Sequence, residues 1–515
     1  MLELTPNLNT KSKIALYVQL YEYIKKEIKD GTIPAFTKLP AKRKLASYLQ
    51  VSKNTVEAAY EQLLAEGYIE SASRKGYFVC KVEQMIYVEG SEAEVEEISF
   101  REENYKFDFT QTGVDTKTFP FTMYRKLIND VWQPHNNELL FLGHPQGELS
   151  LREEIAKYLY ESRGVRCSAS QIVLGAGTQI LVKLLFQLLK GSNYAVENPG
   201  YHRKMVVFEQ GEEKVQMLSL DRDGICMADL ENSDANVVFV TPSHQFPYGM
   251  IMPITRRTQL LQWAKKEEDR YIIEDDYDSE FRYSGKPIPA LQGLDTDGKI
   301  IYMGTLSKAL LPSLRMSYIV LPKNLIKKYQ KEYLFYTQSV SRMDQEVIRK
   351  FLNEGYWEKH IHKMRVVYRK KRDRLVFEIG KYFSNRVEVI GEDSGLHILL
   401  KVHNGMREEE LIKEAAKYSI KIYPVSTYYK DDTAPENVVL LGFAILSEEE
   451  IAQAIQLLNT AWFTKKIKKH PHTREDVFYY LFSSKNKTIC SSSQYCPLYF
   501  NERSCTPNVL NPNDS

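Results

Sequence analysis

The chain has 515 residues, of which 43% are hydrophobic, with 69 basic and 67 acidic side chains. This length is too great for one hydrophobic core, so we expect several domains. The formal net charge of +2 carries no information about a nucleic-acid partner, so charge has to be read segment by segment. No stretch approaches the roughly 20 apolar residues of a membrane span, and the first residues lack the apolar core of a secretory signal. We therefore expect a cytoplasmic protein without a membrane partner, and we expect its six scattered cysteines to be reduced.

Charge and pattern divide the chain into four parts. Residues 10–80 form a basic module, and residues 81–105, which contain eight glutamates, form an acidic linker. Helical patterns alternate with short apolar runs over residues 106–465, which is typical of an α/β domain with a largely parallel sheet. Residues 466–515 are polar and aperiodic, so we expect a disordered tail. The spacing of the three cysteines in this tail fits no zinc finger or ribbon, so no metal site is expected.

The basic module has the pattern of three helices and a β-hairpin. An amphipathic helix over Ile14 to Asp30 precedes a short helix within 39–50, and a third helix follows with Ser52 as its N-cap. Two short alternating segments then flank a turn from Ser71 to Lys75. This order predicts an α+β winged helix-turn-helix domain. A protein–protein module with a basic surface is the alternative interpretation.

A winged helix places the start of its third helix in the major groove of double-stranded DNA. Asn54 would then meet base edges, and amides pair well with adenine. Basic side chains would contact phosphates, so affinity should fall steeply with salt. The candidate DNA-binding residues are Lys42, Arg43, Ser52, Lys53, Asn54, Thr55, Arg74, Lys75 and Gly76.

The larger part holds the groups that an aldehyde cofactor requires. A lysine that forms an imine needs a partner for the pyridine nitrogen, a donor to the phenolic oxygen and a phosphate cup. Lys308 follows an apolar run, Asp275 ends a predicted strand, and the GAGTQ run at 175–179 connects a strand to a helix, where backbone amides face anions. The candidates are Lys308 for the imine, Asp275, Tyr277 and Tyr201 for the ring, and Gly177, Thr178, Gln179, Thr305, Ser307 and Arg315 for the phosphate. Each feature alone is weak, and their order along the chain is the signal.

Several long strings resemble known regulators. LPAKRKLASYLQVSKNTVEAAYEQLLAEGYI resembles the N-terminal domain of GntR-type bacterial regulators, except that Ala41 replaces the usual serine. HPQGELSLREEI, LGAGTQ, ENPGYHR, TPSHQFPYG, EDDYDSEFRYSGKPIPALQGLD and YMGTLSKALLPSLR resemble the MocR family, with its GabR and PdxR branches, over about residues 10–465. The resemblance implies a multidomain transcription regulator that binds promoter DNA, with a type I aminotransferase fold of large and small subdomains. It also implies pyridoxal 5'-phosphate bound as a Schiff base to Lys308, and a head-to-tail homodimer.

The effector is less determined than the cofactor. In the GabR branch two arginines hold the carboxylate of γ-aminobutyrate, and Arg203 matches one of them. The other position is Thr427, whose hydroxyl cannot replace the two charged hydrogen bonds that a guanidinium donates to a carboxylate. The PdxR branch responds to pyridoxal phosphate itself, and we rank this interpretation ahead of an amine effector. His244 is an effector-binding candidate with a structural role as its alternative. A genuine aminotransferase with an accessory N-terminal domain is the competing interpretation. A third interpretation is a vestigial cofactor site in a domain that only supports dimerisation. If the domain is a sensor, we expect at most imine exchange or partial transamination.

Overall fold

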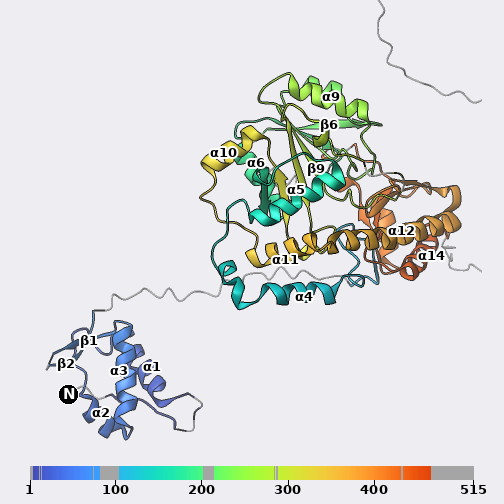
Figure 1. Ribbon diagram of the computed structural model, residues 1–515. Helices are drawn as coiled ribbons and strands as arrows, with labels where there is room; N and C mark the ends of the chain where they lie inside the picture. Colours follow the sequence, from blue (N-terminus) through green and yellow to red (C-terminus); the bar gives the residue numbers. More distant parts are fainter. Residues whose placement is uncertain are drawn as a thin grey trace, which may run out of the picture. The chain divides into compact units, whose positions relative to one another are not determined.

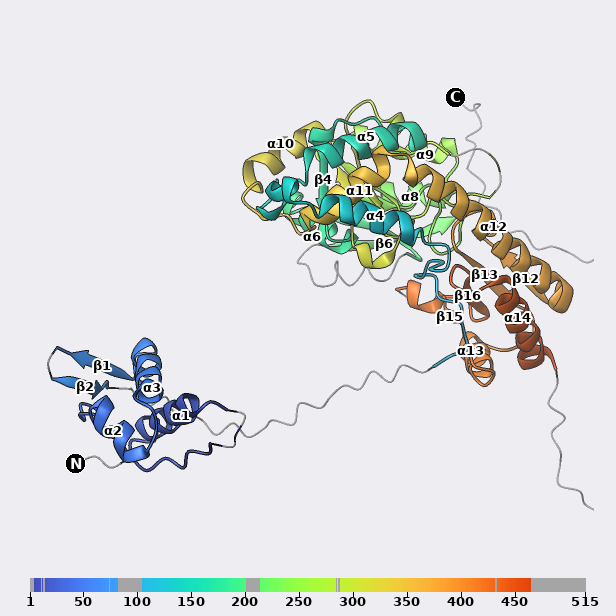
Figure 2. The same ribbon diagram turned by 60° about the horizontal axis from the view of Figure 1, so that its bottom comes forward.

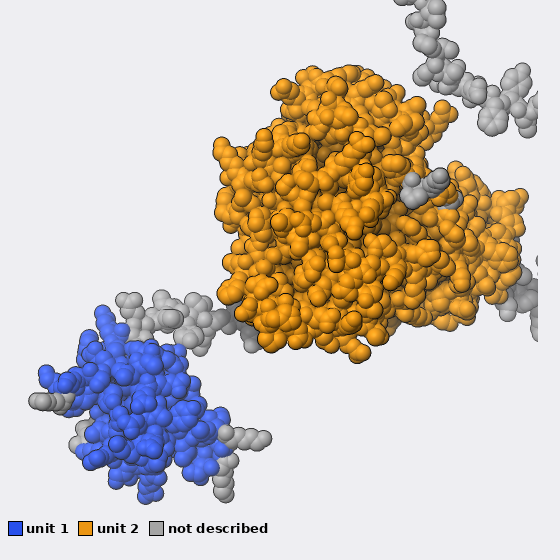
Figure 3. All heavy atoms as spheres, viewed as in Figure 1, with its two compact units in different colours: residues 1–102 blue, residues 103–515 orange. Residues whose placement is uncertain are grey.

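The structure is a computed structural model in which the chain forms two compact units, residues 1–102 (unit 1) and 103–515 (unit 2). Figure 3 colours the two units separately. The residues described are 4–10, 12, 14–73, 75–81, 104–200, 214–283, 285, 288–430 and 433–464. Most of the predicted acidic linker and the whole predicted tail lie outside these ranges. Each unit is described by itself.

Unit 1 has three helices and a hairpin, as predicted. The elements are α1 (Leu16–Lys29), α2 (Lys42–Leu49), α3 (Lys53–Ala65), β1 (Ile69–Ala72) and β2 (Gly76–Val79). The Ser52 hydroxyl caps α3 by accepting a hydrogen bond from the Thr55 backbone N–H at 3.1 Å, because the first turn of a helix has no backbone acceptors of its own. Ile69 pairs with Val79 across the antiparallel hairpin, and both side chains are buried in the core of the unit.

The main sheet of unit 2 has eight strands in the order β4-β11-β10-β9-β8-β5-β6-β7. Its strands are β4 (Ile172–Gly175), β5 (Tyr194–Asn198), β6 (Val215–Asp221), β7 (Gly224–Ile225), β8 (Val237–Val240), β9 (Tyr271–Asp276), β10 (Ile300–Thr305) and β11 (Ser317–Val320). The central neighbours from β10 through β6 run parallel, whereas β11 is antiparallel to both β10 and β4. The expected parallel core is present, with antiparallel strands at its two sides.

Helices cover both faces of this sheet (Figure 1). Successive strand residues point to opposite faces, so Ile273 packs with α6 and α10, while Ile272 packs with α8 and α9. Tyr302 of β10 packs on the side of α5 and α11. Burial on both faces explains why these strands are continuous apolar runs in the sequence. The helices are α4 (Phe121–Val131), α5 (Leu149–Arg163), α6 (Thr178–Leu188), α8 (Met227–Glu231), α9 (Ile254–Lys265), α10 (Lys323–Glu332) and α11 (Arg342–Asn353), with short 3-10 turns at Pro134–Leu140, Ala169–Gln171, Gln292–Leu294 and Pro312–Leu314.

A smaller part of unit 2 is built on a second sheet, ordered β12-β13-β16-β15. Its elements are β12 (Val387–Ile390), β13 (His397–Val402), β15 (Tyr423–Pro424), β16 (Val438–Gly442), α13 (Glu408–Ala416) and α14 (Glu448–Phe463), with 3-10 turns at Ser384–Arg386 and Ser426–Tyr428. The long helix α12 (Tyr356–Phe383) runs from the large part into the small part (Figure 2). Strand β3 (Phe107–Asp108) pairs with β14 (Ile420–Lys421) and so fixes the start of the unit against the small part.

Within the described ranges, no helix combines the length and the apolar composition needed to cross a membrane. Cys80, Cys167 and Cys226 are free thiols.

Candidate functional site

A cavity of about 170 Å³ lies at the carboxyl ends of the central strands of unit 2. β9 ends in the Asp275–Asp276 pair, and β10 ends at Thr305. Ligands in α/β sheets bind at this edge because the loops that follow parallel strands converge there. The sheet therefore gathers side chains that are far apart in the sequence.

Seven of the predicted cofactor residues line this cavity. They are Thr178, Asp275, Tyr277, Thr305, Ser307, Lys308 and Arg315. The other lining residues were not predicted: Gln111, Thr112, Thr241, Phe246, Pro312 and Ser317.

Lys308 lies in the turn after β10, inside the cavity wall. Its Nζ is 4.5 Å from the ring centroid of Tyr277 and 3.6 Å from Oδ2 of Asp278. Burial lowers the pKa of Lys308, and the Asp278 carboxylate opposes that shift. An amine with a lowered pKa has a larger neutral, nucleophilic fraction than a surface lysine.

The predicted phosphate cup is assembled where α6 begins. Gly177 has a φ of +99°, and a Cβ at this position would overlap the guanidinium of Arg315, so only glycine allows the arginine to approach the helix N-terminus. The Ser317 hydroxyl donates to Thr305 Oγ1 at 2.9 Å, and the Met316 backbone N–H donates to Ser307 Oγ at 3.0 Å. These bonds hold two hydroxyls at the cavity beside a cation and a helix N-terminus, which is the chemistry an anion requires.

His244 makes polar contacts on one side of the cavity. Its Nδ1 is 2.9 Å from the hydroxyl of Tyr277 and 3.0 Å from Oδ1 of Asp278. The ring is buried, and that of His397 lies 5.5 Å away, centroid to centroid. His244 thus contacts a predicted cofactor residue directly.

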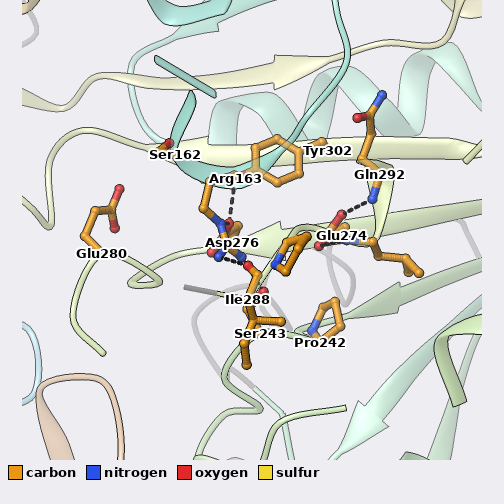
Figure 4. A network of polar contacts seen from close by, with 12 residues as sticks. Ser162, Arg163, Pro242, Ser243, Glu274, Asp276, Glu280, Ile288, Gln292 and Tyr302 are labelled. Carbon is orange, nitrogen blue, oxygen red and sulfur yellow. Dashed lines mark hydrogen bonds and ion pairs between the residues drawn. The ribbon is translucent and has the colours of Figure 1, made fainter. Parts of the chain in front are cut away.

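A buried polar network supports the strand that carries Asp275 (Figure 4). The guanidinium of Arg163 donates to Asp276 Oδ2 at 2.7 Å and to Ser243 Oγ at 2.6 Å, and it also contacts the Ile288 carbonyl. Tyr302 donates to the same Asp276 oxygen at 2.6 Å. Arg163 therefore ties α5 to the end of β9 and to the loop that contains His244.

Side chains of the small sheet pack behind one side of the cavity wall. Leu399 and Leu440 face Phe246, with Tyr277 packed against the same cluster. The Gln111 side chain donates to the Tyr428 hydroxyl at 3.0 Å, which joins the segment after β3 to the loop after β15. The cavity wall therefore includes side chains whose neighbours belong to the small part.

Some predicted site residues are not at this cavity. Gln179 and Thr427 are exposed and do not line it, and the Thr427 hydroxyl donates to the Pro424 carbonyl. Tyr201 and Arg203 lie outside the described residues.

Asp278 and His397 are buried polar residues of this region that were not predicted from the sequence. Asp278 is part of the string EDDYDSEF, but several acidic residues near a strand end give no sign of which one enters the site. His397 begins a strand about 120 residues later, and only the tertiary fold brings it near His244.

In unit 1 the predicted DNA-binding residues lie on α2, at the start of α3 and on the hairpin. Arg43, Ser52, Lys53, Asn54 and Lys75 are exposed, Lys42, Thr55 and Gly76 are half-buried, and Arg74 lies outside the described residues. The Lys42 ammonium is 2.8 Å from Oε1 of Glu57, which raises the pKa of Lys42. Lys42 thus has a carboxylate partner within unit 1, and its contact with DNA stays a prediction.

The folds of the two units together indicate the class of protein to which the chain belongs. A winged helix-turn-helix is joined to an aminotransferase-type α/β domain with a partly buried lysine at the carboxyl edge of its sheet. The family comparison agrees: residues 16–79 match the model of bacterial regulatory proteins of the gntR family, and residues 113–458 match aminotransferase class I and II.

Individual relatives refine this assignment. The chain is 44% identical to the HTH-type transcriptional regulator YdeL of Bacillus subtilis over 463 residues, covering 90% of this chain and 100% of that protein. It is 30% identical to the probable rhizopine catabolism regulatory protein MocR of Rhizobium meliloti, covering 88% of this chain and 95% of that protein. It is 28% identical to the pyridoxine biosynthesis transcriptional regulator PdxR of Corynebacterium glutamicum, covering 87% and 98%. Among solved structures, kynurenine aminotransferase of Pyrococcus horikoshii aligns with a TM-score of 0.61 at 25% identity, covering 70% of this chain and 90% of that chain.

The chain belongs to the MocR family, in which a GntR-type DNA-binding domain is fused to an aminotransferase class I and II domain. It is thus a helix-turn-helix transcription regulator. The aminotransferase match implies that unit 2 binds pyridoxal phosphate. The cavity fits this cofactor, because it combines a partly buried lysine, the carboxylate Asp275 and an anion cradle that excludes a Cβ at position 177.

Proposed function

We propose that this protein regulates transcription in the cytoplasm by binding promoter DNA through unit 1 and sensing pyridoxal phosphate, or an amino compound such as γ-aminobutyrate, through Lys308 of unit 2. The observation that carries the proposal is that Lys308, Asp275, Tyr277 and Arg315 line one cavity in a chain that also has a GntR-type domain.

Each cavity group has a defined task in this proposal. Asp275 accepts a hydrogen bond from the protonated pyridine nitrogen, Tyr277 donates to the phenolic oxygen, and Arg315 with the hydroxyls around it holds the phosphate. When bound, pyridoxal phosphate supplies an aldehyde that condenses with primary amines and a ring that withdraws electrons. Burial favours the neutral amine of Lys308 by lowering its pKa, so this lysine is suited to react with that aldehyde.

Cofactor occupancy is the first-ranked signal. The similarity to PdxR, whose name refers to pyridoxine biosynthesis, supports this ranking. Thr427 is exposed and offers only a hydroxyl, so it is a poor partner for the carboxylate of γ-aminobutyrate. His244 is available to either signal through its contact with Tyr277.

DNA binding would use the exposed groups at the start of α3 together with basic side chains of α2 and the hairpin. Each phosphate contact that a substitution removes should make the slope of log affinity against log salt shallower by about 0.9. Arg43→Ala should show this change when DNA affinity is measured between roughly 50 and 200 mM salt. Lys26→Ala, which removes a charge on α1, is the matched control and should leave the slope unchanged.

A head-to-tail homodimer is part of the proposal. Leu140, Phe141, Leu142 and Phe335 are each at least 70% exposed, and the last three line one groove. Exposed apolar patches of this kind mark protein interfaces, and a two-fold dimer would match paired DNA half-sites. Sedimentation of Leu142→Glu against wild type tests the interface: the variant should become monomeric.

A genuine aminotransferase with an accessory DNA-binding domain is the second candidate. The alignment with kynurenine aminotransferase supports it, because the whole α/β fold around the cavity is shared with an enzyme. Sustained turnover of an amino donor with a keto acid would favour this function over sensing.

The decisive experiment follows the visible absorption of wild type and Lys308→Ala with pyridoxal phosphate, then with γ-aminobutyrate and other amines. Binding to the DNA upstream of the protein's own gene is measured in parallel, with Lys323→Ala as a control lysine at the start of α10. A lysine-dependent band with altered DNA binding on cofactor alone establishes a cofactor sensor, whereas a DNA response only to an amine establishes an amino-compound sensor. Absence of a band in wild type, or no binding to its own promoter, would refute the proposal.

A further inference from the structure

A buried carboxylate beside the cavity has no role in the assignments above. Asp278 is 1% exposed and follows β9 in a turn. Its Oδ1 and Oδ2 lie 3.0 and 3.1 Å from Nδ1 of His244, and its Oδ2 lies 3.6 Å from Nζ of Lys308. The Tyr277 hydroxyl lies 2.9 Å from the same Nδ1. One ring nitrogen therefore faces both a carboxylate and a phenol.

A count of hydrogens decides what this nitrogen does. Nδ1 carries at most one hydrogen. If that hydrogen is present, Nδ1 donates it to Asp278, and the Tyr277 hydroxyl must donate its own hydrogen elsewhere. If it is absent, Tyr277 donates to Nδ1, and an ionised Asp278 would face the nitrogen lone pair at 3.0 Å, which is repulsive.

The surroundings favour an ionised Asp278. Burial alone would raise its pKa, but His244 and Lys308 outweigh burial, and the pKa is lowered. His397 supplies no competing charge, because burial lowers its pKa to about 3 and its Nε2 is 3.0 Å from the Pro247 carbonyl. Glu280 is a second carboxylate that acts on Lys308, and it accepts a hydrogen bond from the Tyr158 hydroxyl.

The site is also tightly packed around this contact. A Cβ at Gly395 would overlap the His244 ring and would lie 2.8 Å from Oδ2 of Asp278. A Cβ at Gly249 would lie 3.1 Å from His244 Nε2. The imidazole is held between two glycines, so it cannot easily turn to exchange its partners.

We propose that Asp278 is a positioning residue: its carboxylate keeps the hydrogen of His244 on Nδ1 and thereby leaves the Tyr277 hydroxyl hydrogen available to a ligand in the cavity. The inference rests on the proposed function, in which that ligand atom is the phenolic oxygen of pyridoxal phosphate. Asp278 acts on the ligand only through His244 and Tyr277, while its proximity to Lys308 adds a separate electrostatic effect.

The first test needs no cofactor. The ¹⁵N spectrum of histidine-labelled wild-type protein at pH 8 reports which His244 nitrogen carries hydrogen, with His244→Gln to assign the signal. Hydrogen on Nδ1 is the expected result. Hydrogen on Nε2 alone in the wild type would overturn the proposal, and this result does not depend on any Asp278 variant folding.

The second test is a double-mutant cycle on the protein loaded with pyridoxal phosphate. Its readout is the midpoint of the pH titration of the visible band. Tyr277→Phe should shift the wild-type midpoint by about 1 pH unit or more, since it removes a hydrogen bond to a charged group. In the Asp278→Asn background the same substitution should shift the midpoint by less than about half of that, because Tyr277 can then donate to Nδ1.

Glu280→Gln is the matched control for the cycle. It removes a carboxylate that acts on Lys308 and accepts from Tyr158, not from His244, so above pH 7 the Tyr277→Phe shift should remain as large as in wild type. An equal shift in the Asp278→Asn background would refute the positioning role while the band itself still supports the proposed function. Absence of the band from wild type would refute the proposed function, and this inference with it.

Discussion

Replacing Arg163 with methionine should destabilise unit 2 strongly, because the substitution leaves buried acceptors without their donor. Arg163 and Asp276 are 6% and 2% exposed in their side chains, and Nε lies 2.7 Å from Oδ2. Asp276 raises the pKa of Arg163 despite the burial of the guanidinium, so Arg163 carries its charge inside the fold. Removing one partner of a buried ion pair costs about 3–5 kcal/mol of unfolding free energy. At about 2 °C per kcal/mol for a large domain, the melting temperature of unit 2 should fall by roughly 6–10 °C.

Scanning calorimetry provides the measurement, with a double-mutant cycle to identify the cause. Adding Asp276→Asn to Arg163→Met should recover part of the stability, since the stranded charge is removed while Tyr302 keeps an oxygen to donate to. Lys266→Met is the control, because its 3.0 Å pair with Glu231 is more than half exposed and should contribute less than about 1 kcal/mol. A destabilisation by Arg163→Met no greater than that of the control, or no recovery in the double variant, would refute the reasoning.

Three further predictions concern capping, the phosphate cradle and pH. Ser52→Ala should lower the unfolding free energy of unit 1 by about 0.5–2 kcal/mol, because it removes the hydroxyl that caps α3. Ala41→Ser should raise the unfolding free energy, because Ala41 is the N-cap residue of α2 and has no side-chain hydrogen bond to the helix. Chemical denaturation of the full chain, followed at unit 1, measures both. Gly177→Ala should weaken pyridoxal phosphate binding at least about tenfold by fluorescence titration, because its Cβ overlaps a cavity guanidinium, whereas Gly191→Ala, with φ +86° and no neighbour within 4 Å, should leave affinity unchanged. Burial raises the pKa of Glu280 to about 7, above its unfolded value, so the contribution of Glu280 to stability is complete at low pH and is lost as the pH rises towards 7. Glu280→Gln should therefore flatten the decline of unit 2 stability between about pH 5 and 7. An unchanged pH profile would contradict this.

The sequence was sufficient to predict the elements whose signals are local. Ser52 caps α3 as predicted because an N-cap hydroxyl acts within one turn of its helix. The strand that carries Asp275 was predicted because burial on both faces produces a continuous apolar run. The direction of β11 was not predictable, since four residues after a turn carry no information about which neighbours they pair with.

The same distinction between local signals and tertiary contacts applies to the residues of the candidate site. Lys308 and Asp275 could be selected because their order along the chain, together with the resemblance, supplied information that single residues lack. Asp278 could not be separated from its acidic neighbours, because the distinction depends on which side of the turn faces His244. The packing of Leu440 behind the cavity wall could not be predicted from the sequence either, since only long-range packing brings it to Phe246.

The position of the cavity bears on how occupancy could control DNA binding. A ligand shifts a conformational equilibrium only by the difference between its affinities for the two states, and moving a population from 1:99 to 99:1 takes about 5.5 kcal/mol. In the proposed site, phosphate contacts at Arg315 would lie within the large part, so they would give affinity without discriminating between arrangements of the two sheets. The wall at Phe246 and Tyr277 packs against Leu440 of the small sheet, so contacts on that side depend on how the two sheets meet. We therefore expect substitutions at the phosphate cradle to lower the affinity for the cofactor and, in parallel, the effect of the cofactor on DNA binding. Leu440→Ala, in contrast, should reduce the effect of the cofactor on DNA binding even when the cofactor is saturating. DNA titrations with and without pyridoxal phosphate would detect this difference.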